Sequence, residues 1–216
     1  MVSGRWRTLA LVLVAIGALA WALTQFRHAG PSNPLTDPAS VERELLADEP
    51  GGALSRTIKQ TFPDEFKALT AAVVARARDG GGPAEVQETA GAFISKATLR
   101  HAPELARAPV GALRAYLATQ IALAEALSAT SPERCAAYFA DPLEGENWYA
   151  PDLRARYLRQ NIALWQAAAA ARDTPVDRMI PAPSPKPVSC AEGLDALKRT
   201  AALPDTQFEQ AYPAML

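Results

Sequence analysis

The sequence predicts an all-α protein, in which an N-terminal transmembrane helix precedes an exported antiparallel helical bundle. Three observations support this fold class. Alanine, which has the highest helix propensity, makes up about a fifth of the 216 residues. An uncharged, apolar stretch long enough to cross a membrane lies near the N-terminus. After it, prolines recur at positions typical of helix starts, and no alternating β pattern of useful length is present.

The composition already excludes several classes of function. Hydrophobic residues make up 49% of the chain and charged residues 21%, which permits a packed core and excludes general disorder. The net charge of −1 lacks the basic excess that nucleic-acid-binding proteins usually carry. The two histidines and two cysteines have no spacing typical of a zinc or haem site. We therefore expect no nucleic-acid partner, no metal and no cofactor.

Residues 8–26 predict the transmembrane helix. At about 1.5 Å per residue, they span roughly the 30 Å hydrocarbon core of a bilayer. Arg5 and Arg7 precede this stretch, and Arg27 and His28 follow it. Because the α-amino group makes the N-terminal side the more positive one, that side is expected to stay in the cytoplasm. With abundant alanine and more arginine than lysine, the chain suggests a single-pass protein of a bacterial inner membrane with a periplasmic C-terminal domain.

A cleaved signal peptide is the alternative reading of residues 1–28. It would have a shorter apolar stretch at 9–17 and a small-x-small cleavage site at Ala18-Leu19-Ala20. The hydrophobic stretch, however, continues beyond that site through Trp21, a residue that membrane interfaces favour. We therefore predict an uncleaved signal anchor, and keep a secreted or periplasmic protein as the alternative location.

The rest of the chain, residues 29–216, carries a formal charge of −4. It divides into a polar spacer at 29–37, a main helical bundle at 38–180, a proline-rich strap at 181–188 and a C-terminal helical pair at 189–216. Four prolines in the strap indicate an extended, polyproline-II-like chain. We interpret the strap as a stiff connection that packs the C-terminal pair onto the bundle, with a proline-reading partner as the alternative.

Prolines and apolar periodicity define the individual helices. Proline is tolerated in the first turn of a helix, and the apolar residues that follow each such proline repeat about every 3.6 positions. Four long helices are predicted at 63–79, 83–101, 109–129 and 151–172. Shorter helices are predicted at 38–48, 53–61, 132–140, 190–201 and 205–212. Gly80-Gly81-Gly82 predicts a turn between the first two long helices, and the short connections favour antiparallel neighbours.

Cys135 and Cys190 are the two cysteines of the chain. An even number of cysteines in an exported, oxidising compartment favours a disulfide. Closing a loop of about 55 residues would stabilise the fold by roughly 3–4 kcal/mol in the chain-entropy model. Two separate buried thiols are the alternative, and neither cysteine belongs to a redox-active C-x-x-C pair.

The loop at 141–151 predicts a partner-binding surface, because acidic and large aromatic side chains occur together in a polar segment. The candidate residues in it are Glu144, Glu146, Trp148 and Tyr149. Arg156 and Arg159 follow on one face of the next helix, where they could attract an anionic group. The alternatives are aromatic rings that fold back over the helices and an ordinary solvated basic face.

Tyr157 and Trp165 mark a second candidate site, a pocket between long helices. His101 lies on an apolar stripe near a helix end and is interpreted as a partly buried structural residue. No recognisable catalytic motif is present, so no catalytic residue is predicted.

These observations favour a non-catalytic, membrane-anchored module that binds or scaffolds another envelope protein. A small-ligand-binding helical domain is the first alternative, and a periplasmic hydrolase with an unrecognised site is the second. We expect a scaffold to expose a large apolar patch, a ligand binder to enclose an apolar pocket, and an enzyme to gather titratable groups in a cleft. The sequence leaves the oligomeric state open.

Overall fold

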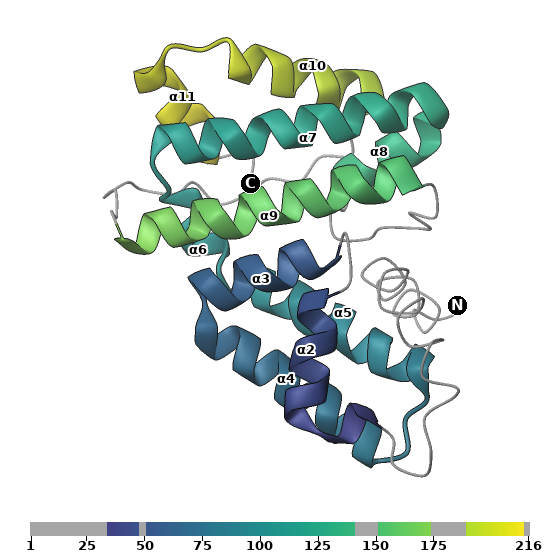
Figure 1. The fold of residues 1–216 in the computed structure, drawn as a ribbon. Helices are drawn as coiled ribbons and strands as arrows, with labels where there is room; N and C mark the ends of the chain where they lie inside the picture. Colours follow the sequence, from purple (N-terminus) through teal and green to yellow (C-terminus); the bar gives the residue numbers. More distant parts are fainter. Residues whose placement is uncertain (1–33, 48–50, 141–150, 174–188, 214–216) are drawn as a thin grey trace, which may run out of the picture. The chain divides into compact units, whose positions relative to one another are not determined.

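A computed structural model of the chain describes four ranges, which are 34–47, 51–140, 151–173 and 189–213 (Figure 1). Every regular element in these ranges is a helix, which confirms the predicted all-α class. None of the described helices has both the length and the apolar content needed to span a membrane. The predicted transmembrane segment and the proline-rich strap lie outside the described residues.

The described residues form two compact units. The first unit comprises those up to Thr98, and the second comprises those from Leu99 onward, so that the division falls near the end of one long helix. Both units contain parts of the predicted bundle at 38–180. The predicted grouping into that bundle and a C-terminal pair stays a prediction.

The first unit contains a 3₁₀ turn and four α-helices. Their bounds are η2 Pro34–Thr36, α2 Pro38–Ala47, α3 Gly51–Thr61, α4 Pro63–Arg78 and α5 Pro83–Arg100. Helices α2, α3 and α4 pack against one another, and η2 packs against α2 and α4. Their shared core is aliphatic and aromatic, with Leu45, Ile58, Phe66, Leu69 and Val73 all buried.

The described part of the second unit contains six helices, of which two form a long antiparallel pair. Their bounds are α6 Ala102–Ala106, α7 Val110–Thr130, α8 Pro132–Ala140, α9 Pro151–Asp173, α10 Cys190–Ala201 and α11 Asp205–Ala211. Helices α7 and α9 lie side by side along most of their length, with α10 on the other side of α7 and α6 against α9 (Figure 1). Leu113, Leu117, Leu123, Leu127 and Trp165 are fully buried in this unit.

Prolines begin the helices for a clear steric reason. Helices α2, α4, α5, α8 and α9 each start at a proline, where the missing N–H would have no intrahelical partner and the fixed φ suits the first turn. Pro109 differs from these residues because it is the N-cap of α7, one residue before the helix. The predicted starts of these helices therefore agree with the structure to within about a residue.

Helix α10 begins with a capping box formed by Ser189 and Glu192. The Ser189 hydroxyl oxygen accepts a hydrogen bond from the Glu192 backbone N–H, and the Glu192 carboxylate accepts one from the Ser189 backbone N–H at 2.9 Å. These hydrogen bonds with Ser189 hold the pKa of Glu192 below its ordinary value. One turn into α10, a Cβ at Gly193 would lie only 2.5–2.7 Å from ring carbons of Phe139, so glycine permits the close contact with α8.

Cys135 and Cys190 form the predicted disulfide at this contact. It joins α8 to the first residue of α10, with the two Cα atoms 5.1 Å apart and the two cysteines separated by 55 positions in the sequence. This separation lies within the normal range for a disulfide. The cross-link therefore connects two helices that already pack against each other.

Arg114 on α7 holds the junction between α10 and α11. Its guanidinium donates hydrogen bonds to the carbonyl oxygens of Ala201 at 2.9 Å and Leu203 at 2.6 Å. It also pairs with the Asp205 carboxylate at 2.8 Å and lies 4.3 Å from the centre of the Phe208 ring. The planar group thus satisfies two carbonyls at a helix end, which would otherwise lack intrahelical partners.

Replacing Arg114 by methionine is expected to lower the free energy of unfolding by about 2 kcal/mol, because charge-assisted hydrogen bonds to two carbonyls are lost. Equilibrium denaturation measures the change. Arg199→Met is the matched control, since Arg199 is 70% exposed and pairs only with Asp195 among the described acidic residues. That substitution should cost less than about 0.5 kcal/mol. Equal losses for the two variants would contradict the role given to Arg114.

Candidate functional site

The residues of the predicted partner-binding surface lie in different environments. Glu144, Glu146, Trp148 and Tyr149 fall outside the described residues. Arg159 on α9 is exposed, whereas Arg156 is half-buried and donates a hydrogen bond to the Ala122 carbonyl of α7 at 3.4 Å. Arg156 therefore connects two helices, and of the two arginines Arg159 is the one at the surface.

The residues of the predicted pocket belong to the core of the second unit. Trp165 is fully buried, and its ring lies 5.5 Å from the His101 ring, centre to centre. His101 precedes α6 and places Nδ1 3.8 Å from a Glu104 carboxylate oxygen. Tyr157, about two turns earlier on α9, is half-buried, and its backbone carbonyl accepts a hydrogen bond from Asn161. His101 is thus partly buried beside an aromatic ring, which agrees with its structural interpretation.

A buried polar group in the same unit was not predicted. This tyrosine–glutamine cluster consists of Tyr116, Gln120, Tyr138, Gln160 and Tyr212. Burial raises the pKa of Tyr116 to about 12, although the side chains of Gln160 and Gln120 hydrogen-bond to it and lower the pKa in part. Burial also raises the pKa values of Tyr138 and Tyr212, and the Tyr212 hydroxyl donates a hydrogen bond to Gln120 Oε1. All three phenols are therefore neutral at physiological pH.

Two atoms of this cluster are unusual for a protein interior. The Tyr138 hydroxyl and the Gln160 Oε1 are buried without a well-aligned hydrogen bond to a described residue, although Gln160 and Gln120 lie close enough to Tyr138 to lower its pKa in part. Buried polar atoms are normally paired with protein groups or ordered water. The cluster thus places polar side chains in the core between α7, α8 and α9, where the other buried side chains of the described residues are mostly apolar.

The raised tyrosine pKa values predict a loss of stability at high pH. A phenol with a raised folded-state pKa contributes its full stability below the ordinary value near 10. That contribution should fall as the pH rises from about 10 towards the folded value of about 12 for Tyr116. Phenolate absorbance and denaturation midpoints across this range test the prediction. The control is a titration in denaturant, where all tyrosines should ionise near 10; the same curve without denaturant would contradict buried phenols.

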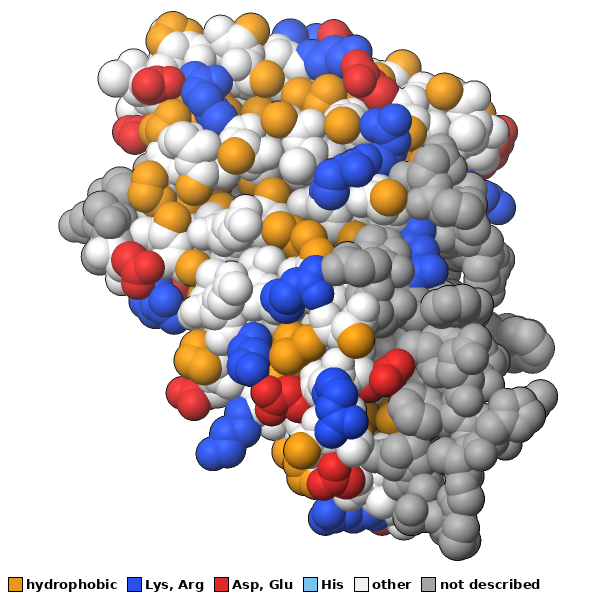
Figure 2. Space-filling view, in the orientation of Figure 1, with side chains coloured by type: hydrophobic (Ala, Val, Ile, Leu, Met, Phe, Trp, Pro, Cys, Tyr) orange, Lys and Arg blue, Asp and Glu red, His pale blue; other side chains and the backbone are white. Residues whose placement is uncertain are grey.

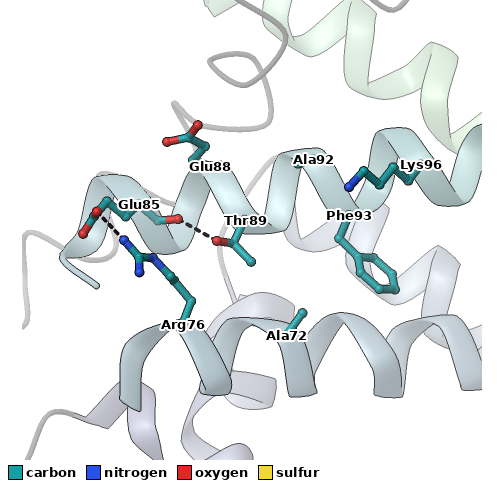
Figure 3. A pocket seen from close by; sticks show the side chains of 8 residues that line it. All are labelled: Ala72, Arg76, Glu85, Glu88, Thr89, Ala92, Phe93 and Lys96. Atoms are coloured by element: carbon teal, nitrogen blue, oxygen red, sulfur yellow. Dashed lines mark hydrogen bonds and ion pairs between the residues drawn. The ribbon is translucent and has the colours of Figure 1, made fainter. Parts of the chain in front are cut away.

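The second candidate site is a groove of about 480 Å³ in the first unit (Figure 3). Helix α4 and helix α5 form its two sides, and its lining residues are Ala72 and Arg76 of α4 with Glu85, Glu88, Thr89, Ala92, Phe93 and Lys96 of α5. Phe93 and Ala72 lie across the groove from each other, whereas Glu88 points away from α4 (Figure 3). The groove therefore has a small apolar centre and a charged rim.

A tight glycine turn brings the two sides together. Gly80 has φ +83°, a backbone conformation that residues other than glycine rarely adopt. A Cβ at Gly81 would lie 2.8 Å from the Arg76 carbonyl oxygen, so the chain passes close to the end of α4. Arg76 then forms an ion pair with Glu85, and the other Glu85 oxygen accepts a hydrogen bond from Gly82 N–H at 2.9 Å. These contacts close one end of the groove.

The charges of the groove differ in how they are balanced. The Gly82 N–H, followed by the Arg76 guanidinium, holds the pKa of Glu85 below its ordinary value, so Glu85 is a carboxylate at neutral pH. Glu88 and Lys96 make no ion pair within the described residues. The groove therefore offers one negative and one positive side chain to a partner, about 12 Å apart along α5.

Large hydrophobic side chains are rarely exposed in the part of the chain that the structure describes. Leu99, 59% exposed, is the one large hydrophobic side chain that is exposed among the described residues. On the face in Figure 2, small apolar areas alternate with basic and acidic side chains. The described residues on this face thus form a mixed surface, and the expectation of a large apolar patch stays a prediction. A mixed surface of this kind is typical of non-obligate protein contacts.

The described residues contain no group of three or more histidine, cysteine, aspartate or glutamate side chains that could hold a metal ion. The sequence signal for the groove was the glycine turn, which requires the two helices to be neighbours. The signal for the tyrosine–glutamine cluster was weak, since its members are distributed over α7, α8, α9 and the end of α11. Comparison of the chain with protein-family models, curated proteins and solved structures finds no match.

Proposed function

We propose that the chain is a membrane-tethered, exported helical module that holds a helix of a neighbouring envelope protein without catalysis. The groove between α4 and α5 is the observation that carries this proposal. Its rim bears two charges of opposite sign, neither of which forms an ion pair with another described residue, and its centre is small and apolar. A helix laid into a groove is a common mode of recognition, in which apolar side chains supply contact and charges select the partner.

The dimensions of the groove suit one short helix. Its lining on α5 extends from Glu85 to Lys96, which is about 16 Å or three helical turns. Ala72 and Ala92 are small, so the backbone of a partner helix can approach closely between them.

The electrostatics favour binding over proton transfer. Glu85 is held ionised by the Gly82 N–H and by Arg76, so it is a poor proton donor at neutral pH. Arg76 is occupied by the same carboxylate. Glu88 and Lys96 are too far apart along α5 to act on one reacting atom, but they are well spaced to orient a helix.

The tether and the location rest on the sequence. Residues 8–26 are apolar and long enough to cross a bilayer, and the positive side chains lie mainly before them. A tether confines the module and its partner to one membrane surface, which raises the effective concentration of each for the other. A shallow groove of modest affinity is then sufficient.

Site-specific photo-crosslinking in intact membranes tests the proposal. A photoreactive phenylalanine analogue at Thr89, inside the groove, should give discrete crosslinked species. The same analogue at Ala71, an exposed α4 residue outside the groove lining, is the control and should give none of them. Ala92→Arg should abolish the Thr89 products by filling the groove, while Ala71→Arg should not. Equal products from both positions, or products that persist with Ala92→Arg, would overturn the proposal.

A further inference from the structure

The rim of α5 has a symmetric charge pattern. Glu88, Ala92 and Lys96 follow one another at intervals of four residues, so they lie along one face of the helix. Glu88 and Lys96 are equally distant from Ala92, about 6 Å along the axis in opposite directions. Neither charge is paired within the described residues. Along this face of α5, the pattern therefore consists of a negative residue at one end, a small residue at the centre and a positive residue at the other end.

We propose that the helix held at this groove is α5 of a second copy of the chain, in antiparallel orientation. This inference rests on the proposed function and names its partner. In an antiparallel pair centred on Ala92, Glu88 of each copy lies opposite Lys96 of the other, and Ala92 lies opposite its own counterpart. Such a contact is isologous, the self-complementary type that a two-fold axis requires.

The charges also select the orientation. A parallel pair in the same register would place Glu88 against Glu88 and Lys96 against Lys96, and like charges in contact are unfavourable. The antiparallel pair converts both repulsions into attractions. The Arg76–Glu85 ion pair leaves this selection unchanged, because those two side chains already neutralise each other at the closed end of the groove.

The centre of the contact permits close approach. Alanine at position 92 presents one methyl group, so two α5 helices can meet with little steric hindrance at the two-fold axis. Thr89 and Phe93 flank that point and line the groove next to it (Figure 3). Because exposed ion pairs contribute little individually and are screened by salt, the dimer is weak in dilute solution and favoured by the membrane tether.

Disulfide trapping of the full chain in membranes tests the geometry. Ala92→Cys places two thiols at the two-fold axis, where a disulfide needs Cβ atoms about 4 Å apart. With mild oxidant, this variant should give a covalent dimer on a non-reducing gel. The matched control, Ala71→Cys, introduces the same change at an exposed alanine on α4 and should stay monomeric. No dimer from Ala92→Cys, or equal dimer from Ala71→Cys, overturns the inference.

Charge reversal tests the pairing itself. Glu88→Lys and Lys96→Glu should each weaken self-association about tenfold, because each replaces two attractions with two repulsions. The double variant Glu88→Lys/Lys96→Glu restores opposite charges across the axis and should recover the original association. Helix content from circular dichroism verifies that all three variants fold. A double variant as weak as either single variant overturns the pairing.

The two proposals fail in distinguishable ways. Photo-crosslinks from Thr89 that contain only a different protein, together with no Ala92→Cys dimer, overturn the second copy as partner but leave the proposed function standing. Absence of both the Thr89 crosslinks and the Ala92→Cys dimer overturns both. Crosslinks that contain a second copy, with a dimer from Ala92→Cys and recovery in the double charge variant, support both.

Discussion

Replacing Trp165 by alanine is expected to lower the free energy of unfolding of the second unit by about 3–5 kcal/mol. Trp165 is fully buried and packs against the His101 ring, on the helix that forms the long pair with α7. Removing the indole leaves a large cavity in a core whose other side chains cannot move in to fill it. Equilibrium denaturation followed by circular dichroism measures the loss.

Trp165→Phe is the matched comparison, because it keeps a ring and most of the buried area. It should cost clearly less than the alanine variant. A denaturation midpoint for Trp165→Ala close to that of the unmodified chain would show that Trp165 has a surface position, contrary to the structure. Since such a loss is a large fraction of the stability of a typical domain, the alanine variant is also expected to be the more sensitive to proteolysis.

Replacing both Cys135 and Cys190 by serine is expected to cost about 4 kcal/mol, the chain-entropy value for a loop of this length. The reason is that the disulfide restricts the unfolded chain across 55 positions of sequence. Denaturant titration of the double serine variant, beside the unmodified chain with and without reductant, measures the effect.

The reduced, unmodified chain is the control for this prediction, since it lacks the cross-link but keeps both sulfur atoms. Its stability should lie close to that of the double serine variant. If reductant leaves the midpoint of the unmodified chain unchanged while the double variant is destabilised, the loss comes from polar hydroxyls in a buried site, and the entropic explanation is wrong.

The helices were predictable because their signals are local. Proline in the first turn fixes φ and defines the start of a helix, as at Pro63, Pro83 and Pro132. The apolar periodicity that follows each proline indicates the helix itself. Helix α6 was missed, since its five residues are too short for a periodic pattern. The turn η2 was likewise hidden within the predicted polar spacer.

The site residues were less predictable because they depend on contacts between distant positions. Tyr212 hydrogen-bonds to Gln120 across 92 positions, and no local pattern specifies that pairing. In the helix predicted at 109–129, Leu113, Tyr116 and Leu117 are buried but Ile121 is half-buried, a distribution that apolar spacing alone does not specify. The sequence indicates more about the groove, because helices joined by a glycine turn are neighbours. Arg76 and Glu85 lie at similar distances from that turn, so their proximity follows from it.

The position of the disulfide also determines what a single proteolytic cut would do. Cleavage of any peptide bond between Cys135 and Cys190 divides the chain into two pieces that remain covalently connected through sulfur. The nicked protein would therefore keep its mass on a non-reducing gel and separate into two bands only after reduction. Because α11 contacts α7 and α10, and Arg114 bonds to the α10–α11 junction, the C-terminal piece would also keep its noncovalent attachment after the cut.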